Sequence, residues 1–273
     1  MARLASPWLI PLTAATLAAA ACSSTGTEPS QNAAEAYLGK WNYDQPDAAS
    51  MTNMAVLQLP SGPVQAPQIG DITYTLDASD ASRTHLIGRT DVGCTWRFRV
   101  DPDALRLDPA TQLCNNPTSH VSYTITAWTT TVSGNHMTEV FTAKSHRADR
   151  DLDFALETGA RTRTSENDTD GAAAFVGTWH YEPPGQGELT ITADYGNRLT
   201  ARTGNGCSWT LLVRGNTAKL DPPVQTCPRP GDTTETRTAW TIAATGTRGS
   251  TIVVGVDEAG GALTPGAGSL AKG

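Results

Sequence analysis

The chain repeats itself, and this duplication constrains its fold more than any other feature of the sequence. A Gly-Cys-x-Trp motif, a Leu-Asp-Pro motif and a second cysteine recur in the same order, at 93–96, 107–109 and 114 and again at 206–209, 220–222 and 227. A Thr-Ala-Trp follows each unit, and a Gly-x-Trp-x-Tyr precedes each, at 39–43 and 177–181. Repeats of this kind indicate copies of one structural unit. We therefore expect two domains of the same architecture.

Both units consist of short runs of alternating or β-branched residues, broken about every ten residues by Gly, Pro, Asp and Asn. Such spacing is typical of antiparallel all-β structure, and a small antiparallel sheet hides its edges most easily by closing into a barrel. We predict an all-β fold of two tandem antiparallel β-barrels, each with about seven to eight short strands. The expected strands are 72–76, 85–89, 95–100, 105–107, 121–131, 137–143 and 152–156, then 175–181, 189–193, 198–203, 208–214, 217–220, 234–244 and 251–256.

The Gly-x-Trp pairs Gly39 with Trp41 and Gly177 with Trp179 stand at the entrance of a first strand that leads into an up-and-down series. This pattern resembles the lipocalin and calycin group. The resemblance implies lipocalin-like barrels in which an arginine of the last strand packs across the tryptophan. The cations available for this role are Arg161 or Arg163 in the first unit and Lys272 in the second.

Composition divides the rest of the chain. We expect a signal peptide at 1–21, a flexible polar tether at 22–36, the first barrel at 37–163, a polar linker at 164–174 and the second barrel at 175–273. The first unit carries an insertion at 45–70 that the second lacks and that contains four prolines. The insertion is interpreted as an excursion or lid with one short strand near 55–59.

The leader ends in Ala19-Ala20-Ala21-Cys22 after an apolar stretch that is short for a membrane span. Small residues before a cysteine, followed by a polar segment, resemble the lipobox of bacterial lipoproteins. That resemblance implies that Cys22 is the lipid anchor, carrying fatty acyl chains such as palmitate, and that the chain is attached to a membrane of the cell envelope. The alternative is an ordinary secretory peptide cleaved after Ala21, which would leave Cys22 as a free thiol.

The remaining cysteines are two pairs, each separated by 20 positions. Of the three connectivities that four cysteines allow, only Cys94 to Cys114 with Cys207 to Cys227 leaves two independent domains. The spacing matches neither a CxxC redox motif nor a zinc-ribbon pattern, so we expect disulfides and no metal site. An export route fits this expectation, because disulfides persist outside the cytoplasm.

Charge and motifs exclude several function classes. The formal net charge of −7 comes without a basic patch, which argues against a nucleic-acid partner. The sequence contains no Gly-x-Ser-x-Gly elbow, no His-Glu-x-x-His and no phosphate-binding loop, and its five histidines have no counterparts between the units. We therefore expect neither an enzyme nor a cofactor.

Three tryptophans recur between the units, and most are interpreted as barrel core. Trp41 and Trp128 are the candidate ligand-binding residues, because aromatic side chains commonly line small-molecule cavities. The function expected from the sequence is a lipid-anchored envelope protein that binds a small apolar ligand or an envelope or host protein, with any site on the first barrel. The alternative is a structural or assembly lipoprotein without a ligand cavity.

Overall fold

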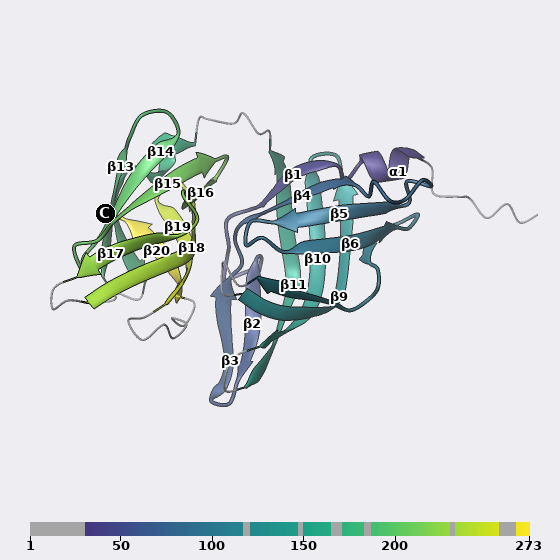
Figure 1. Ribbon diagram of the computed structural model, residues 1–273, viewed down its shortest axis with the longest axis horizontal. Coiled ribbons are helices and arrows are strands. Elements are labelled where there is room, and N and C mark those ends of the chain that lie inside the picture. Colours follow the sequence, from purple (N-terminus) through teal and green to yellow (C-terminus); the bar gives the residue numbers. More distant parts are fainter. Residues whose placement is uncertain are drawn as a thin grey trace, which may run out of the picture.

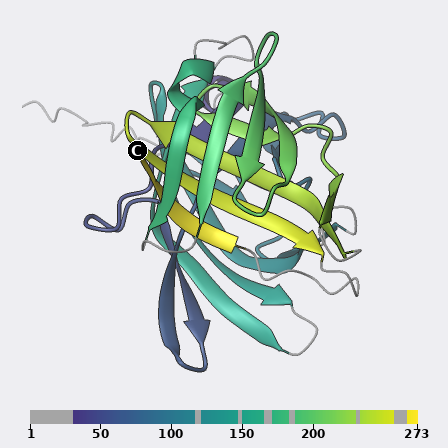
Figure 2. The same cartoon turned by 90° about the vertical axis from the view of Figure 1, so that its left-hand side faces the viewer.

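A computed structural model describes residues 31–116, 121–146, 150–164, 171–182, 187–229, 233–256 and 266–273. These residues form two closed, eight-stranded antiparallel β-barrels that lie side by side, the first in blue and teal and the second in green and yellow (Figure 1). Figure 2 shows the second barrel in front of the first. The predicted architecture of two tandem barrels is confirmed. Within the described residues no helix is long and apolar enough to cross a membrane.

The first barrel is a closed ring, because its first strand pairs on one side with the next strand of the ring and on the other side with the last strand. Helix α1 (Gln31–Glu35) precedes it, and strand β8 (Gln112–Asn116) pairs with β9 outside the ring. The ring order is β1 (Gly39–Tyr43), β4 (Asp71–Leu76), β5 (His85–Thr90), β6 (Thr95–Val100), β7 (Leu105–Leu107), β9 (Val121–Ser133), β10 (His136–His146) and β11 (Asp151–Thr164).

The second barrel repeats this order strand by strand, as the duplication predicts. Helix α2 (Ala172–Phe175) precedes it, and β17 (Gln225–Arg229) takes the place of β8. The ring consists of β12 (Gly177–Glu182), β13 (Glu188–Ala193), β14 (Arg198–Thr203), β15 (Ser208–Arg214), β16 (Thr217–Leu220), β18 (Thr233–Thr245), β19 (Arg248–Val256) and β20 (Gly266–Lys272).

Alternation along the strands decides what each barrel buries. In β6 the side chains of Trp96, Phe98 and Val100 are buried, whereas those of Thr95 and Arg99 are exposed. Successive side chains of a strand point to opposite faces, so this segment has one interior and one solvent face. The same rule fills each barrel with a separate apolar core.

The insertion differs from the single strand expected at 55–59. It contains a hairpin of β2 (Met54–Leu59) and β3 (Gly62–Pro67), and β2 pairs with β11 through Leu57 and Phe154 (Figure 1). This pairing arises because β11 is longer than the ring requires: its second half pairs with β1, and its first half is left with an edge that β2 completes.

Some expected boundaries were wrong, because short segments pack onto the barrels. The tether was expected to reach residue 36, yet α1 is helical and Ala34 is buried in the first core. The linker was expected to reach residue 174, yet α2 leads into the fully buried Phe175. The glycine-rich tail forms β20, where a side chain in place of Gly268 would come within 3.2 Å of the Tyr181 ring.

The two barrels are joined by polar contacts between β1 and the β15–β16 turn. The amide of Asn42 donates to the Asn216 Oδ1 at 2.9 Å, and the amide of Asn216 donates to the backbone carbonyl of Tyr43 at 3.0 Å. The predicted tight turn at 214–216 is present, with Gly215 at a φ of 59°. The turn that closes a hairpin in the second barrel is therefore also one of its docking points on the first.

Candidate functional site

One end of each barrel is closed by a tryptophan under a cation. The Trp41 Nε1 donates to the backbone carbonyl of Tyr37 at 2.7 Å, and the Arg163 guanidinium carbon lies 4.3 Å from the indole centroid. In the second barrel the Trp179 Nε1 donates to the carbonyl of Phe175 at 2.7 Å, and the Lys272 Nζ lies 5.3 Å from the ring. Of the two candidate arginines, Arg163 occupies this position.

The other end of the first barrel opens into an apolar cavity of about 260 Å³. The cavity lies against the outer wall of the second barrel, which contributes residues of β18 and β19. Its walls are formed by Tyr43, Gln68, Ile69, Asp71, Thr90, Asp91, Val92, Val121, Tyr123, Ile125, Trp128, Phe141, Phe154 and Arg161 of the first barrel and by Thr241, Ile252 and Val254 of the second. The docking of the barrels therefore creates a shared, partly open space.

Aromatic side chains make up much of the cavity wall. Phe141 lies between Trp128 and Phe154, with ring centroids 5.6 and 5.9 Å away, and Tyr123 lies 6.1 Å from Phe154. Edge-to-face and tilted contacts at these distances add about 0.5–1.5 kcal/mol per pair beyond the burial of apolar area. These contacts pack the aromatic side chains of the wall against one another.

A buried ion pair lies at the base of the cavity. Arg161 and Glu139 are each about 2% exposed, and the guanidinium donates to both carboxylate oxygens, at 3.0 and 3.2 Å. The Trp128 Nε1 and the Tyr43 hydroxyl also donate to Glu139. Although burial opposes it, the neighbouring Glu139 raises the pKa of Arg161 above its usual range, so the guanidinium stays charged.

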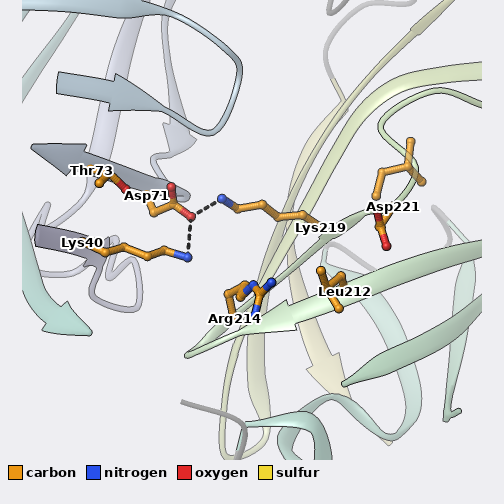
Figure 3. A pocket seen from close by; sticks show the side chains of 8 residues that line it. Lys40, Asp71, Thr73, Leu212, Arg214, Lys219 and Asp221 are labelled. Carbon is orange, nitrogen blue, oxygen red and sulfur yellow. Dashed lines mark hydrogen bonds and ion pairs between the residues drawn. The ribbon is translucent and has the colours of Figure 1, made fainter. Parts of the chain in front are cut away.

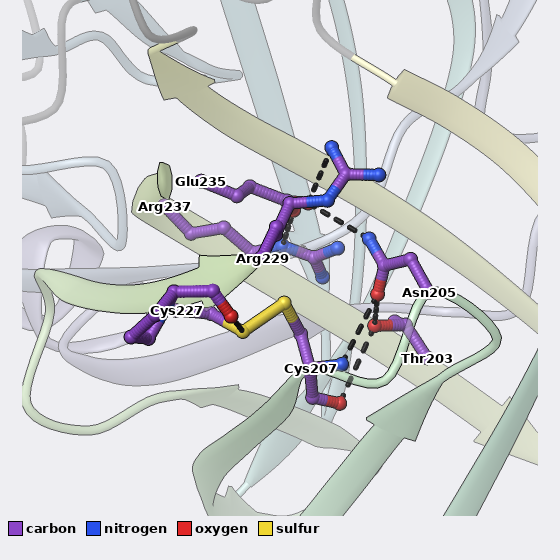
Figure 4. Close-up of a disulfide and its surroundings, with 8 residues drawn as sticks. Thr203, Asn205, Cys207, Cys227, Arg229, Glu235 and Arg237 are labelled. Carbon is purple, nitrogen blue, oxygen red and sulfur yellow. Dashed lines mark hydrogen bonds and ion pairs between the residues drawn. A yellow bond between two sulfur atoms is a disulfide. The ribbon is translucent and has the colours of Figure 1, made fainter. Parts of the chain in front are cut away.

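The second barrel fills the corresponding space with its own side chains. The pairing of β8 with β9 and of β17 with β18 shows which positions of the two barrels are equivalent: Glu235 stands in the place of Tyr123, and Arg237 in the place of Ile125. The Arg237 guanidinium stacks over Trp209 and Trp240, at 4.3 and 4.1 Å from the ring centroids. Figure 4 shows Arg237 and Glu235 beside the disulfide, where the carboxylate accepts a hydrogen bond from Arg237 at 2.8 Å. The open cavity therefore distinguishes the first barrel from its copy.

The structure places some of the predicted site residues as expected and others elsewhere. Both disulfides, Cys94 to Cys114 and Cys207 to Cys227, are present as expected. Trp128 lines the cavity, whereas Trp41 is enclosed at the opposite end and does not reach it. Cys22 lies outside the described residues. In the part of the chain that the structure describes, no three His, Cys, Asp or Glu side chains gather as a metal site would require.

Sequence reasoning missed Glu139 and considered Arg161 only as a cation over the tryptophan, although one signal for their pairing was present. In β10 the inward positions alternate through Met137, Glu139 and Phe141, so the period of two places a carboxylate inside the barrel. A buried carboxylate requires a cation or several hydrogen bonds. Its partner lies 22 residues away on β11, and the strand pairing brings the two together.

Comparison with known proteins adds little to this geometry. No protein-family model matches the chain, and no curated protein matches it. Among solved structures, a candidate outer membrane protein from Bacteroides fragilis NCTC 9343 has 9% identity and a TM-score of 0.28, over 88% of this chain and 99% of that one. A DUF3598-family protein of unknown function from Nostoc punctiforme PCC 73102 has 11% identity and a TM-score of 0.28, over 89% and 98%.

The fold and the cavity define a class, a tandem pair of small β-barrels with an apolar cavity at the open end of the first. Neither solved structure bears on function at such low similarity. The functional conclusion therefore rests on the geometry of the chain itself.

Proposed function

We propose that this protein is a lipid-anchored binding protein of the cell envelope, and not an enzyme, that holds a small apolar ligand in its first barrel. The observation that carries the proposal is the aromatic-lined cavity between Trp128 and the second barrel. Small-molecule sites are concave and mostly apolar with a few polar groups, and they commonly measure about 300–1,000 Å³. A cavity of about 260 Å³ lies just below this range, so it suits a small ligand.

The asymmetry between the barrels supports a single site. The second barrel buries Arg237 against two tryptophans where the first leaves open space lined by Ile125 and Tyr123. The insertion also contributes, because Gln68 and Ile69 at its end line the cavity. The enclosing wall comes from β18 and β19 of the second barrel, so the second copy serves as a cover in this proposal.

A cavity-filling substitution tests the proposed site. Val254 lies on the outer face of β19, is 9% exposed and lines the cavity, so Val254→Phe should place a ring in the ligand space without entering either core. We expect binding of the neutral probe N-phenyl-1-naphthylamine, followed by its fluorescence, to weaken at least about tenfold, since the probe would lose most of its buried apolar contact.

Val140→Phe is the matched control, because Val140 lies on the outer face of β10 and is 48% exposed. This variant should bind the probe like the unmodified protein. Equal probe binding by Val254→Phe and Val140→Phe, with both proteins folded by circular dichroism, would contradict the proposed site.

Anchoring by Cys22 is a separate prediction. Two acyl chains are enough for stable membrane attachment, whereas one is marginal. If Cys22 carries them, Cys22→Ala should move the protein from the membrane fraction to the soluble fraction of the cells that produce it. Retention of Cys22→Ala in membranes after a high-salt wash would count against a lipid anchor at this residue. A chain changed at exposed Tyr195, for example Tyr195→Ser, controls for the effect of substitution alone.

A further inference from the structure

Some polar side chains in the wall of the apolar cavity are fully engaged by other groups of the protein. The Arg161 guanidinium donates to both carboxylate oxygens of Glu139. The Asp71 carboxylate lies 3.2 Å from the Lys40 Nζ and also contacts Lys219, which reaches it from the second barrel (Figure 3). These charged groups therefore need no ligand to satisfy them.

Two other side chains of the wall have hydrogen-bonding capacity that the protein leaves unused. The backbone N–H of Gln68 donates to the Asn53 carbonyl at 2.7 Å, but no described residue pairs with its side-chain amide. The Asp91 carboxylate accepts one hydrogen bond, from the Thr241 hydroxyl to Oδ2 at 3.2 Å, and Oδ1 accepts none from the part of the chain that the structure describes. A ligand made only of hydrocarbon would leave both groups without a partner.

Of these two side chains, Asp91 is the more deeply buried, and its position is fixed. Its side chain is 9% exposed, whereas Gln68 is only half-buried. The carboxylate lies directly over Gly70, where an added Cβ would come within 2.5 Å of Oδ2. The Asp91 N–H donates to the backbone carbonyl of Asp71 at 3.2 Å. The first barrel and the Thr241 hydroxyl of the second thus hold this carboxylate in one place.

The charge of Asp91 is compensated, but its lost solvation is not. The Lys219 Nζ lies 3.9 Å from the Asp91 Oδ2, which is an ion-pair distance but too long for a hydrogen bond. Burial raises the pKa of the Asp91 carboxyl, and the neighbouring Lys219 only partly offsets this. A buried carboxylate normally accepts several hydrogen bonds in place of those that it made to water. The group therefore lacks a hydrogen-bond donor rather than a further cation.

The second barrel has neither of these side chains, and its interior is filled. The turn at 90–94 recurs at 203–207, with the same backbone hydrogen bond of 3.0 Å in each. Gly204 stands in the place of Asp91 in this alignment, and the insertion that carries Gln68 is absent from the second unit. Both side chains therefore belong to the barrel that has the cavity.

We propose that the ligand is an apolar molecule with one hydroxyl group, which donates a hydrogen bond to Asp91; this rests on the binding function proposed above. A phenol or an alcohol fits this description. The hydroxyl is neutral, so it supplies the missing donor without disturbing the charge balance of the cavity. Hydrogen bonds to a carboxylate are among the strong ones, which makes Asp91 the residue that determines specificity.

Competition between two molecules of the same shape tests this assignment. N-phenyl-1-naphthylamine bound to the full chain is displaced either by 1-naphthol or by 1-methylnaphthalene, which has a methyl group in place of the hydroxyl. A wall without an acceptor would favour 1-methylnaphthalene, because the hydroxyl would lose its hydrogen bonds to water. We expect the opposite order, with 1-naphthol binding about threefold more tightly or better, since hydrogen bonds to charged groups are strong.

Variants of Asp91 should change the ratio of the two affinities. Asp91→Leu removes the acceptor and should shift the ratio about tenfold or more toward 1-methylnaphthalene. Asp91→Asn keeps an uncharged acceptor and should give an intermediate ratio. Gln45→Leu is the matched control, because Gln45 also donates across the barrels, to the Ser250 hydroxyl at 3.1 Å, but does not line the cavity. It should keep the ratio of the unmodified protein.

The ratio separates this test from the test of the cavity itself. If the probe binds but 1-naphthol is not favoured, or if Asp91→Leu leaves the ratio unchanged, the hydroxyl assignment is wrong and the binding function stands. If the probe does not bind, both fail. A shift in Gln45→Leu as large as that in Asp91→Leu would trace the effect to weakened docking and would also overturn the assignment. Should Asp91→Leu fail to fold by circular dichroism, Asp91→Asn decides the outcome.

Discussion

Replacing Glu139 by threonine alone should lower the free energy of unfolding by about 3–5 kcal/mol, the cost of leaving a buried charge without its partner. In this variant Arg161 would keep its charge in the first core, where its side chain is 2% exposed, with the Trp41 carbonyl as its remaining acceptor at 3.3 Å. The expected loss is large because a buried guanidinium loses the carboxylate that compensates its charge. Urea unfolding followed by tryptophan fluorescence measures it.

The second barrel shows how this loss can be recovered. At the positions of Glu139 and Arg161 it carries Thr251 and Leu270, and the Thr251 hydroxyl accepts from the Trp240 Nε1 at 2.7 Å. The double variant Glu139→Thr with Arg161→Leu should therefore be more stable than Glu139→Thr, by about 2 kcal/mol or more, because no unpaired charge remains. If the free energy of unfolding lost by the double variant equals the sum of the losses in Glu139→Thr and in Arg161→Leu, the two side chains do not act as a pair.

Removing either disulfide should cost about 3 kcal/mol of stability in its own barrel. Each bridge joins cysteines 20 positions apart, and the chain-entropy model assigns roughly this value to a loop of that size. The loss matters because a whole domain is stable by only about 5–15 kcal/mol. Cys94→Ala with Cys114→Ala should weaken the first barrel, and Cys207→Ala with Cys227→Ala the second.

Hydrogen exchange followed by mass spectrometry separates the two cases, since peptides of each barrel report its own opening. The protection of β6 should fall in the first variant, while that of β15 stays nearly unchanged; the second variant should show the reverse. Equal loss of protection in both barrels from one disulfide would show that the barrels unfold as a single unit.

Much of the fold could be predicted because the relevant signals are local. The alternation of Trp96, Phe98 and Val100 shows which side of β6 is buried, and the duplicated spacing of cysteines leaves one sensible pairing. A Gly-Asn pair at 215–216 predicts a hairpin turn, and this signal too lies in adjacent residues. Each of these features depends on residues that are neighbours in the chain or on the comparison of two copies.

The strands that were missed lack such a signal. Strand β20 consists mostly of glycine, alanine and serine, a composition typical of loops, and its place is decided by pairing with β12 and β19. The β2–β3 hairpin was only half predicted, because it depends on the free edge that the long β11 offers. Pairing between distant segments compensates for weak local preference.

The sequence by itself determined two repeated barrels, their disulfides and the inward-facing residues, because period-two patterning and motif spacing act through the local chain. Tertiary structure alone decided the site. Thr241 and Val254 point outward from the second barrel, where alternation predicts contact with water, yet both are buried against the first barrel. That burial forms one wall of the apolar cavity, and the same docking brings Lys219 to Asp71. The physical reason is that docking depends on the shape and charge of the surfaces of two folded barrels, which no residue pattern within a single strand encodes.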